Sequence, residues 1–436
     1  MNIILLSGGS GKNLWPLSND VRSKQFIKLF QNKIGQNESM IQRIYRQIRA
    51  IDPDALITVA TSRSQASTLF NQLGHTIGLS AEPMRRDTFP AVVLALEYLK
   101  DVRRVDPSEP VVVCPVDLFT DDSFFHALEE LSREVVNGPG IMLLGTEPTG
   151  PSTQYGYILP HTDDRISTVK AFREKPDEES ARKYIEEGAL WNAGIFAFRM
   201  SYVLHLAHER IDYEDYDDLY NKYAQLTPIS FDHAVLENNP YVAVLRSDTK
   251  LDDLGTWNAL SKATEQTIIG NGIVTPACEN VNIINDMDIP VLAAGVKDVV
   301  ISASQQGILV TSRDSAEDIR PYVDQINEKV MFAEKSWGNF KVLDVSDGSM
   351  TIKLTIHAGK RMSYHSHEHR DEIWAVVSGW GRTIVDGMEQ PVQAGDVITM
   401  QAGCRHTIIA ITTLDVIEIQ CGDEITTSDK RKFELE

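Results

Sequence analysis

Basic residues, cysteines and long apolar runs are all scarce in this chain. Lysine and arginine number 42 against 62 aspartates and glutamates, which gives a formal net charge of −20. Nucleic acids and anionic membranes bind basic protein faces, so this balance argues against both as partners. Any site for a phosphate group must therefore be a local basic pocket.

The four cysteines, Cys114, Cys278, Cys404 and Cys421, lie far apart in the sequence and form no CxxC pair. Such sparse cysteine suits a reducing cytosol and argues against a disulfide scaffold. The N-terminal apolar run has no basic flank and is too short for a signal peptide or a membrane span. These absences together predict a cytoplasmic protein.

The length and composition are those of a soluble protein with several domains. A chain of 436 residues exceeds one ordinary hydrophobic core, and its length predicts roughly two to four domains. A content of 42% apolar and 24% charged residues is typical of globular proteins.

A glycine-rich loop, Ser7-Gly8-Gly9-Ser10-Gly11-Lys12, follows the first apolar run. Glycines lack a Cβ atom and accept positive φ, so their backbone N–H groups can approach the phosphates of a nucleotide closely. The same glycines would also suit a tight strand-to-helix turn. Their spacing fits neither GxGxxG nor GxxxxGK[ST], so neither of those loop mechanisms applies.

Residues 1 to about 150 alternate apolar runs with helical patterns. We expect strands over 2–7, 56–60, 111–114 and 141–145, and helices near 39–49, 64–73, 90–100 and 122–136. This alternation predicts a mostly parallel sheet with helices on both faces. Ligands of such sheets bind at the carboxyl ends of the strands, so the glycine loop and Asp117 should line one crevice.

Asp117 is the candidate metal ligand of this crevice. A Mg²⁺ ion bound to a nucleotide needs one or two protein carboxylates and keeps several waters, so Asp117 and one partner would suffice. A lone aspartate at a strand end can also be a helix cap.

The pattern changes beyond Trp257. Short β-branched runs separated by glycine and asparagine predict a small β-rich segment, closed by a helix near residues 315–328. From about Lys335 onward, short strands at even spacing are typical of a β-sandwich or small barrel.

Four side chains of this last region form a candidate metal site. His365 and His367 are two residues apart, so on a strand they face the same side, and Glu372 and His406 on neighbouring strands would complete a pocket. Three imidazoles and a carboxylate favour Zn²⁺, Fe²⁺, Mn²⁺ or Ni²⁺, and the sequence does not choose among them. An isolated HxH pair can also be polar strand surface.

Several motifs occur in the order known from one enzyme family. The glycine loop, with Leu14-Trp15-Pro16-Leu17-Ser18 and Ser23-Lys24-Gln25-Phe26, resembles the opening of the sugar-1-phosphate nucleotidylyltransferases, above all the mannose-1-phosphate guanylyltransferase branch. Further matching motifs are Glu82-Pro83 with Arg86, Pro115-Val116-Asp117, Tyr155-Gly156-Tyr157, Phe172-Arg173-Glu174-Lys175-Pro176, Trp191-Asn192-Ala193-Gly194 and Asp253-Leu254-Gly255-Thr256-Trp257.

The C-terminal spacing resembles a second family. Gly359-x5-His365-x-His367-x4-Glu372-x6-Gly379, followed by Gly395-x7-Gly403-x2-His406, is similar to the cupin signature. A cupin joined to this transferase resembles the bifunctional proteins that carry a type II mannose-6-phosphate isomerase.

The resemblance implies a fold class and a domain order. We expect a Rossmann-like α/β nucleotidyltransferase domain over residues 1–264, a β-rich linker domain over 265–333 and a cupin β-barrel over 334–436. The implied substrates are a nucleoside triphosphate and a sugar 1-phosphate, most of all GTP and mannose 1-phosphate. A homodimer is a further expectation from the family.

The resemblance also assigns roles to residues. It implies that Asp253 joins Asp117 on Mg²⁺ and that Lys24 neutralises charge on the triphosphate. Residues implied for nucleotide binding are Gly8, Gly9, Gly11, Lys12, Glu82 and Arg86. Residues implied for sugar-phosphate binding are Gly156, Glu174, Lys175 and Asn192, and a surface ion pair is the alternative for Glu174 and Lys175.

The sequence departs from both family patterns. Asn13 replaces the usual arginine of the glycine loop, Arg85 and Asp87 replace the glycine and asparagine of the usual EPxGRNT motif, and Leu118 replaces the histidine of PADH. These changes leave open slower turnover, another nucleotide or sugar, or a non-catalytic sensor of sugar nucleotides. In the cupin, His365 stands where glutamine is usual, and residues 426–436 do not reproduce the family's tail, so isomerase activity also stays open.

Overall fold

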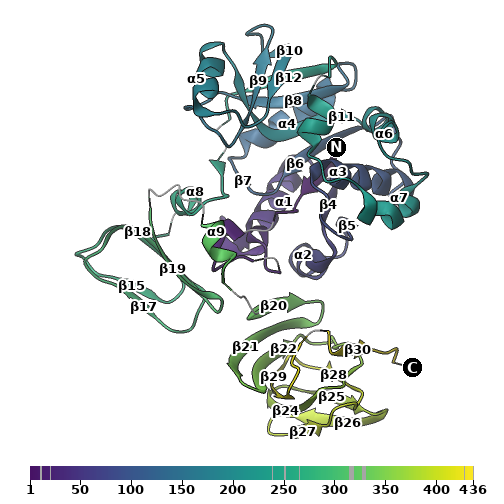
Figure 1. The fold of residues 1–436 in the computed structure, drawn as a ribbon, viewed down its shortest axis with the longest axis vertical. Coiled ribbons are helices and arrows are strands. Elements are labelled where there is room, and N and C mark those ends of the chain that lie inside the picture. The colour runs from purple at the N-terminus through teal and green to yellow at the C-terminus, as the bar shows by residue number, and fades with distance from the viewer. Residues whose placement is uncertain are drawn as a thin grey trace. The chain divides into compact units, whose positions relative to one another are not determined.

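The computed structural model describes residues 1–9, 12–19, 21–237, 239–249, 252–264, 266–313, 319–326, 330–426 and 428–435, without the side chains of residues 193, 252 and 253. The chain forms two compact units (Figure 1). The first contains Met1–Leu14 and Ser23–Glu265, and the second contains Trp15–Arg22 and Gln266–Glu436.

A nine-stranded sheet forms the centre of the first unit, in the order β5-β4-β1-β6-β11-β8-β12-β10-β9. Its strands are β1 (Asn2–Leu6), β4 (Leu56–Ser62), β5 (Gly78–Glu82), β6 (Pro110–Pro115), β8 (Ile141–Thr146), β9 (Gly156–Pro160), β10 (Ile166–Arg173), β11 (Leu190–Arg199) and β12 (Val242–Ser247). Strands β5, β4, β1 and β6 pair in parallel, whereas β10 and β11 pair antiparallel with their neighbours. The α/β class expected from the sequence is confirmed, and the sheet is mixed, because the antiparallel pairings of β9, β10 and β11 stand beside the parallel ones.

Helices cover both faces of this sheet, because apolar side chains of the central strands point to both sides. They are α1 (Met40–Ile51), α2 (Ala66–Leu73), α3 (Thr88–Glu97), α4 (Ser123–Glu134), α5 (Glu178–Glu186), α6 (Met200–His208) and α7 (Tyr216–Lys222). Helix α8 (Trp257–Ala263) follows β13 and contributes no residue to the cores of this sheet. Residues of α3, α6 and α7 share one core with Ile4, and residues of α1, α2 and α4 share another core with Ile3 and Leu5.

The register of β1 and β6 places two candidate loops side by side. Leu6 is opposite Pro115, and the amide of Val116 donates to the carbonyl of Leu6 at 3.1 Å. The residues that follow these strands, the glycine loop and Asp117, therefore leave the sheet at the same edge. Short pairs flank this edge: β2 (Lys28–Gln31) with β3 (Asn37–Ser39), and β7 (Leu118–Phe119) with β13 (Asp252–Asp253).

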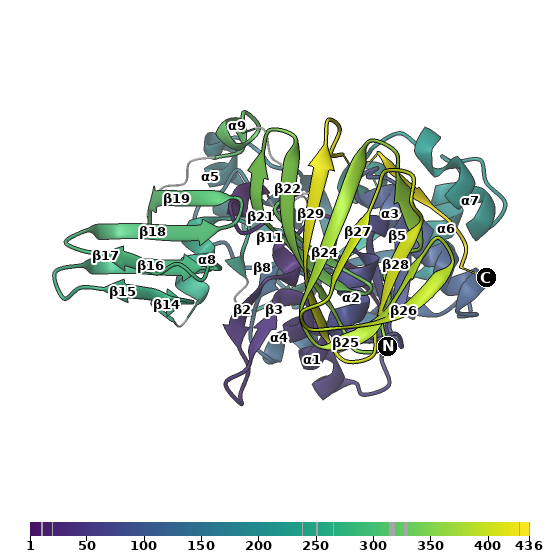
Figure 2. The same cartoon turned by 90° about the horizontal axis from the view of Figure 1, so that it is seen from below.

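The second unit begins with a coil of short strands, which Figure 2 shows lying side by side. They are β14 (Ile268–Ile269), β15 (Gly272–Val274), β16 (Glu279–Asn285), β17 (Val291–Ala293), β18 (Lys297–Ser304) and β19 (Gly307–Ser312). Strands of successive turns pair in parallel, and only the β18–β19 pair described here is antiparallel. Of the helix expected near 315–328, the described part is α9 (Arg320–Val323), and residues 314–318 and 327–329 lie outside the described residues.

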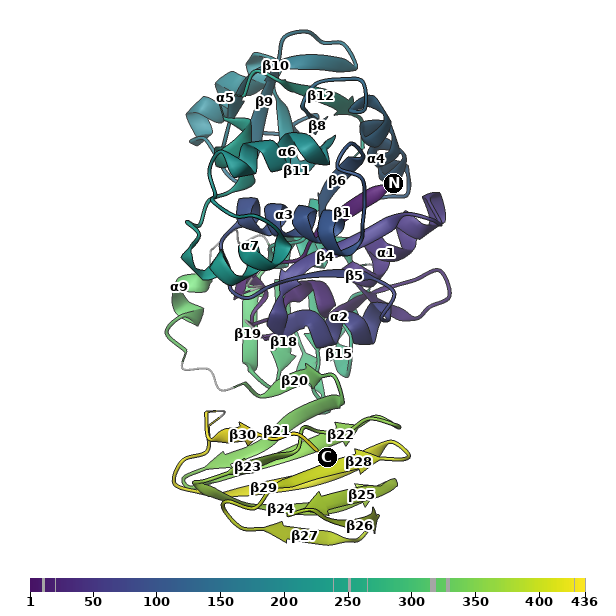
Figure 3. The ribbon, with the colours of Figure 1, turned by 90° about the vertical axis from the view of Figure 1, so that its right-hand side faces the viewer.

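Two sheets of antiparallel strands form the C-terminal barrel (Figure 3). One contains β20 (Phe332–Lys335), β21 (Gly338–Ser346), β22 (Ser349–Ile356), β24 (Arg370–Ser378), β27 (Val397–Met400) and β29 (Leu414–Gly422). The other contains β23 (His365–His367), β25 (Trp380–Val385), β26 (Met388–Gln393), β28 (His406–Ala410) and β30 (Lys430–Lys432). Trp374, Ile356, Leu414 and Val416 are fully buried between them, so the expected barrel is confirmed. Among the described residues, no helix has the length and apolarity needed to cross a bilayer.

Candidate functional site

A cleft opens at the carboxyl edge of the first unit's sheet. Its lining residues are Pro115, Asp117, Leu118, Gln154, Tyr155, Gly156, Glu174, Lys175, Asn192, Gly194 and Asp232. The structure therefore brings Asp117 together with all four residues expected to bind the sugar phosphate. Tyr155 stacks on Trp191, with 4.7 Å between the ring centroids, and so contributes an aromatic wall.

The sugar side of this cleft is built on paired strands. Gly156 on β9 is opposite Asn192 on β11, and a Cβ atom at Gly156 would lie 2.7 Å from Oε2 of Glu174. Glycine at this position thus gives the Glu174 carboxylate its space. Lys175 has φ of +40° and places its Nζ 3.3 Å from Oε1 of Glu174. A non-glycine residue in this region of φ is strained, as often occurs at functional sites.

Asp232 is a cleft residue that the sequence analysis did not identify. It begins the π-helical turn η6 (Asp232–Leu236), and its Oδ1 accepts a hydrogen bond of 2.9 Å from Nδ2 of Asn192. Oδ1 of Asn192 in turn accepts from the Gly194 amide at 3.2 Å, which fixes the amide's orientation. Burial, together with the nearby Glu174, raises the pKa of Asp232 to about 6. An aspartate beside the apolar residues Phe231, Ala234, Val235 and Leu236 was the available signal.

Lys24 and Asp117 form a direct ion pair. Nζ of Lys24 lies 2.6 Å from Oδ2 of Asp117, and Lys24 is only 9% exposed. Lys24 belongs to the short helix η2 (Lys24–Phe26), which Gln25 fastens to the end of β1 by donating to the carbonyl of Ser7 at 2.9 Å. The Lys-Gln-Phe motif is therefore held at the same edge of the sheet as Asp117.

Asp253 is placed by its backbone. It pairs with Leu118 across β13 and β7, and the amide of Leu254 donates to the carbonyl of Asp117 at 3.2 Å. The side chain of Asp253 lies outside the described residues. Its convergence with Asp117 on one cation stays a prediction.

The residues expected to bind the nucleotide are less closely gathered. None of them is among the cleft residues named above, and Gly11 lies outside the described residues. Gly8 and Gly9 follow Ser7, the first residue after β1, and a Cβ atom at Gly8 would lie 3.9 Å from Oε1 of Glu82. Burial raises the pKa of Glu82, which accepts a 2.7 Å hydrogen bond from Tyr223. Arg86 donates to the carbonyl of Ala224, and Lys12 begins the short helix η1 (Lys12–Leu14).

The barrel contains the four expected metal-site residues as one buried cluster. His365, His367, Glu372 and His406 are each 2% exposed, and one ligand atom from each lies within 4.8 Å of the others. His365 on β23 is directly opposite His406 on β28, and Glu372 comes from β24. The side chains predicted to converge are therefore in contact.

The three imidazoles are oriented by backbone carbonyl groups. Nδ1 of His365, His367 and His406 lies 2.6, 3.2 and 3.0 Å from the carbonyl oxygens of Ser363, Asp429 and Cys404. A carbonyl only accepts, so each Nδ1 carries the proton and each Nε2 keeps a lone pair. Burial lowers the pKa of His367 to about 4 and also lowers that of His365, so both are neutral, as metal ligands must be.

Glu372 completes the donor set. Burial raises its pKa, and the positive guanidinium of Arg370, whose Nε donates to Oε1 at 3.1 Å, acts in the opposite direction. Oε2 of Glu372 and Nε2 of His406 lie 3.1 Å apart, both are acceptors, and neither has a hydrogen-bond partner among the described residues. Buried polar atoms without a hydrogen-bond partner are rare in folded proteins. Here they belong to a set of three imidazoles and a carboxylate, which fits a divalent transition metal.

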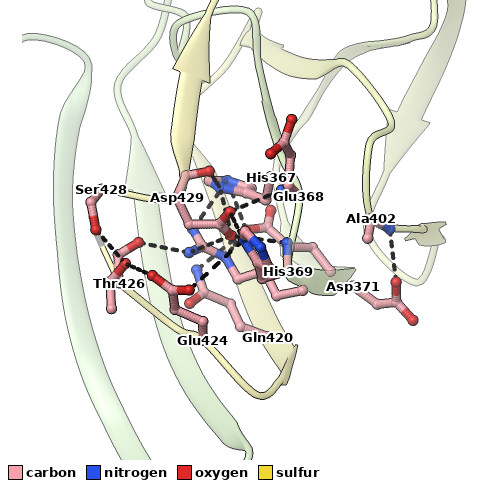
Figure 4. A network of polar contacts seen from close by, with 12 residues as sticks. His367, Glu368, His369, Asp371, Ala402, Gln420, Glu424, Thr426, Ser428 and Asp429 are labelled. Atoms are coloured by element: carbon pink, nitrogen blue, oxygen red, sulfur yellow. Dashed lines mark hydrogen bonds and ion pairs between the residues drawn. The ribbon is translucent and has the colours of Figure 1, made fainter.

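A polar network holds this cluster to the C-terminal segment (Figure 4). Asp429 accepts hydrogen bonds from the amide of Glu368 at 2.9 Å and from Nδ1 of His369 at 2.9 Å. Strand β30 pairs with β23, so Lys430 is opposite His367 and Lys432 is opposite His365. The tail therefore lies directly against the strand that carries two of the four cluster residues.

The open α/β sheet with a ligand cleft at its carboxyl edge, followed by a β-barrel with a buried histidine cluster, defines a nucleotidyltransferase fold fused to a cupin. The chain belongs to the nucleotidyl transferase family, whose model matches residues 2–268. A second model, the C-terminal domain of mannose-6-phosphate isomerase, matches residues 324–435.

Named relatives extend over nearly the whole chain. The xanthan biosynthesis protein XanB of Xanthomonas campestris pv. campestris is 28% identical, over 99% of this chain and 97% of its own. The mannose-1-phosphate guanylyltransferase of Escherichia coli K12 is 26% identical, over 99% of this chain and 97% of its own. The crystal structure of a mannose-1-phosphate geranyltransferase from Thermus thermophilus is 26% identical, with a TM-score of 0.62, and covers 74% of this chain and 98% of its own.

Proposed function

We propose that this protein is a mannose-1-phosphate guanylyltransferase, which makes GDP-mannose and diphosphate from GTP and mannose 1-phosphate. The observation that carries the proposal is the cleft in which Asp117 lies with Gly156, Glu174, Lys175 and Asn192. The full-length relatives named for this activity support the choice of substrates.

The proposed reaction is a displacement at the α-phosphorus of the nucleotide. A phosphate oxygen of the sugar 1-phosphate forms the new P–O bond, and the bond to the β-phosphate breaks with its electron pair leaving on diphosphate. Such chemistry needs in-line positioning and charge neutralisation more than covalent participation by the protein. The carboxylate of Glu174 accepts hydrogen bonds from sugar hydroxyls, and the ammonium of Lys175 binds the sugar phosphate.

Asp117, with Asp253 as its partner, would hold the Mg²⁺ ion. The donor set fits a hard cation, because Asp117 offers a carboxylate oxygen and the backbone of Asp253 runs beside it. When bound, the ion supplies positive charge to the triphosphate. Lys24, already 2.6 Å from Asp117, contributes a second positive charge in the same place.

Pyrophosphate release tests this function directly. Purified protein with Mg²⁺ is incubated with each nucleoside triphosphate and a panel of sugar 1-phosphates, and the pair GTP and mannose 1-phosphate should react fastest. A faster pair would instead identify another nucleotide or sugar. No release with any pair, together with binding of a sugar nucleotide, would favour the sensor.

Replacement of Asp117 by asparagine tests the assignment of the metal. Asp117→Asn keeps the size of the side chain but removes its charge, so kcat should fall by about a hundredfold or more. The Mg²⁺ concentration needed for half-maximal rate should rise. Unchanged turnover would contradict the role of Asp117.

A second activity is favoured by the buried cluster of the barrel. We propose that His365, His367, Glu372 and His406 bind a divalent transition metal and that this site isomerises a sugar phosphate. When bound, the metal polarises the carbonyl and hydroxyl oxygens of the sugar. The isomerase is tested by measuring conversion of mannose 6-phosphate to fructose 6-phosphate with Zn²⁺, Fe²⁺, Mn²⁺ and Ni²⁺ in turn. The metal content of the purified protein tests the metal site independently of any isomerase activity.

We also propose that the protein works in the cytoplasm and forms a homodimer. All four cysteines are free, which supports a reducing cytoplasm as the place where the protein works. A homodimer is proposed from family membership, and light scattering during size-exclusion chromatography measures it.

A further inference from the structure

Arg370 lies inside the barrel directly against the histidine cluster. It is the first residue of β24 and is only 7% exposed. Its Nη2 lies 3.1 Å from Nε2 of His367, and its Nε donates to Oε1 of Glu372 at 3.1 Å. A single guanidinium thus contacts two of the four cluster residues.

The contact with His367 uses the atom that a metal ion would need. The guanidinium has no acceptor, so Arg370 is the donor and Nε2 of His367 the acceptor. The Nδ1 proton of His367 is directed to the carbonyl of Asp429 at 3.2 Å, so Nε2 holds the lone pair of the ring. A neutral imidazole has one such lone pair. It can accept from Arg370 or bind a metal, but it cannot do both.

Glu372 does not face the same choice. Arg370 contacts Oε1, whereas Oε2 faces Nε2 of His406 at 3.1 Å. The carboxylate can therefore keep its bond to Arg370 through one oxygen and offer the other to a metal. His367 is the cluster residue for which guanidinium and metal compete.

The C-terminal segment holds Arg370 in this position. Nη1 donates to the carbonyl of Thr426 at 2.9 Å and lies 3.6 Å from Oδ2 of Asp429. The C-terminal segment therefore binds Nη1 of Arg370, while Nε and Nη2 face the cluster. Charge adds to the competition, since a fixed cation beside the site repels a divalent ion.

We propose that Arg370 competes with a bound metal ion for Nε2 of His367, so that the ion gains His367 as a ligand only when the guanidinium releases it. The inference rests on the proposed metal-binding cupin and adds a residue that sets its affinity.

Titration with Co²⁺ tests the competition, since the visible absorption of bound Co²⁺ reports its coordination without any assay of activity. The full-length protein, Arg370→Met and Arg382→Met are titrated, and a His365→Ala/His406→Ala variant supplies the background from other sites. Arg382→Met is the matched control, since this barrel arginine pairs with Glu389 and both are about half exposed. We expect Arg370→Met to bind Co²⁺ about tenfold more tightly, the value of one charged hydrogen bond, and Arg382→Met to match the wild type.

Equal or weaker binding by folded Arg370→Met, with cluster-dependent binding in the wild type, would overturn the competition but leave the metal site intact. No cluster-dependent binding in either protein would overturn the metal site itself and the competition with it. If Arg370→Met fails to fold, Arg370→Lys takes its place. Lysine keeps the charge but lacks the fork that spans His367 and Glu372, so affinity should still rise, and an unchanged affinity would contradict the proposal.

Discussion

Asp232 is a buried carboxylate that faces the cleft beside Glu174. It accepts from Asn192 and is among the residues that line the cleft. Two neighbouring carboxylates can accept hydrogen bonds from the hydroxyl groups of a sugar. Asp232→Asn should therefore raise the KM for the sugar 1-phosphate by about tenfold, the loss of one charged hydrogen bond, and leave the KM for the nucleotide nearly unchanged. Initial rates with each substrate varied separately measure both constants, and an equal rise in both would contradict this role.

The same substitution should change how stability depends on pH. The folded-state pKa of Asp232, about 6, lies above its ordinary value of 3.8, so the folded protein binds this proton more tightly than the unfolded chain. Ionisation therefore costs stability as pH rises through 6, by about 3 kcal/mol at most. Asp232→Asn removes this cost, so the variant should gain stability relative to wild type, and its free energy of unfolding should exceed that of wild type by more at pH 8 than at pH 5. Urea denaturation at both values measures the difference, and equal differences would contradict the shift.

Individual residues were predictable where a motif contained them. Asp117 and the four sugar-side residues stand in family motifs, and the structure gathers them in one cleft. Asp232 was missed because its contact with Asn192 joins residues 40 positions apart, and no local pattern reports such a contact. The Lys24–Asp117 ion pair was missed for the same reason, although both residues were identified singly.

At the scale of elements, the pairing of β9 with β11 sets the shape of the sugar side. Gly156→Ala should lower kcat/KM for the sugar 1-phosphate by about tenfold or more, because the new methyl group would lie 2.7 Å from Oε2 of Glu174 and 3.0 Å from the Phe172 ring. Gly150→Ala is the matched control, since a Cβ atom there meets nothing within 4 Å. Steady-state kinetics of both variants measure the effect, and equal activity of Gly156→Ala and wild type would contradict the assigned packing.

Strands β1, β4, β6 and β8 and helices α1 to α4 were predictable from hydrophobic periodicity, since buried strands such as residues 111–113 are continuous apolar runs. Strand β30 was not, because Lys430, Arg431 and Lys432 have no apolar alternation. It forms because its backbone completes the sheet next to β23 and because Asp429, the residue before it, accepts from the amides of Glu368 and His369 that follow β23. Tertiary pairing of this kind overrides local propensity.

On the scale of the whole molecule, the two compact units are not two consecutive stretches of the sequence. Residues 15–22 lie between the glycine loop and Lys24, yet they belong to the second unit. Oγ of Ser304 donates to the carbonyl of Pro16 at 2.6 Å, and a Cβ atom at Gly307 would lie 2.6 Å from the Trp15 ring. The motif Leu-Trp-Pro-Leu-Ser was recognised in the sequence, but its partners, Ser304 and Gly307, stand far along the chain and could not be read from it.

This division predicts unequal effects of two truncations. Removal of residues 334–436 should leave nucleotidyl transfer close to that of the full chain, because the transferase cleft is lined from the first unit and the Thermus relative spans only 74% of this chain. Removal of residues 266–436 should lower kcat by about a hundredfold or more, because Trp15 and Leu17 lose their packing and the segment that leads to Lys24 loses its position. Pyrophosphate release and circular dichroism of both truncated proteins measure activity and folding. A folded and fully active protein ending at residue 265 would show that the strand coil has no part in positioning Lys24.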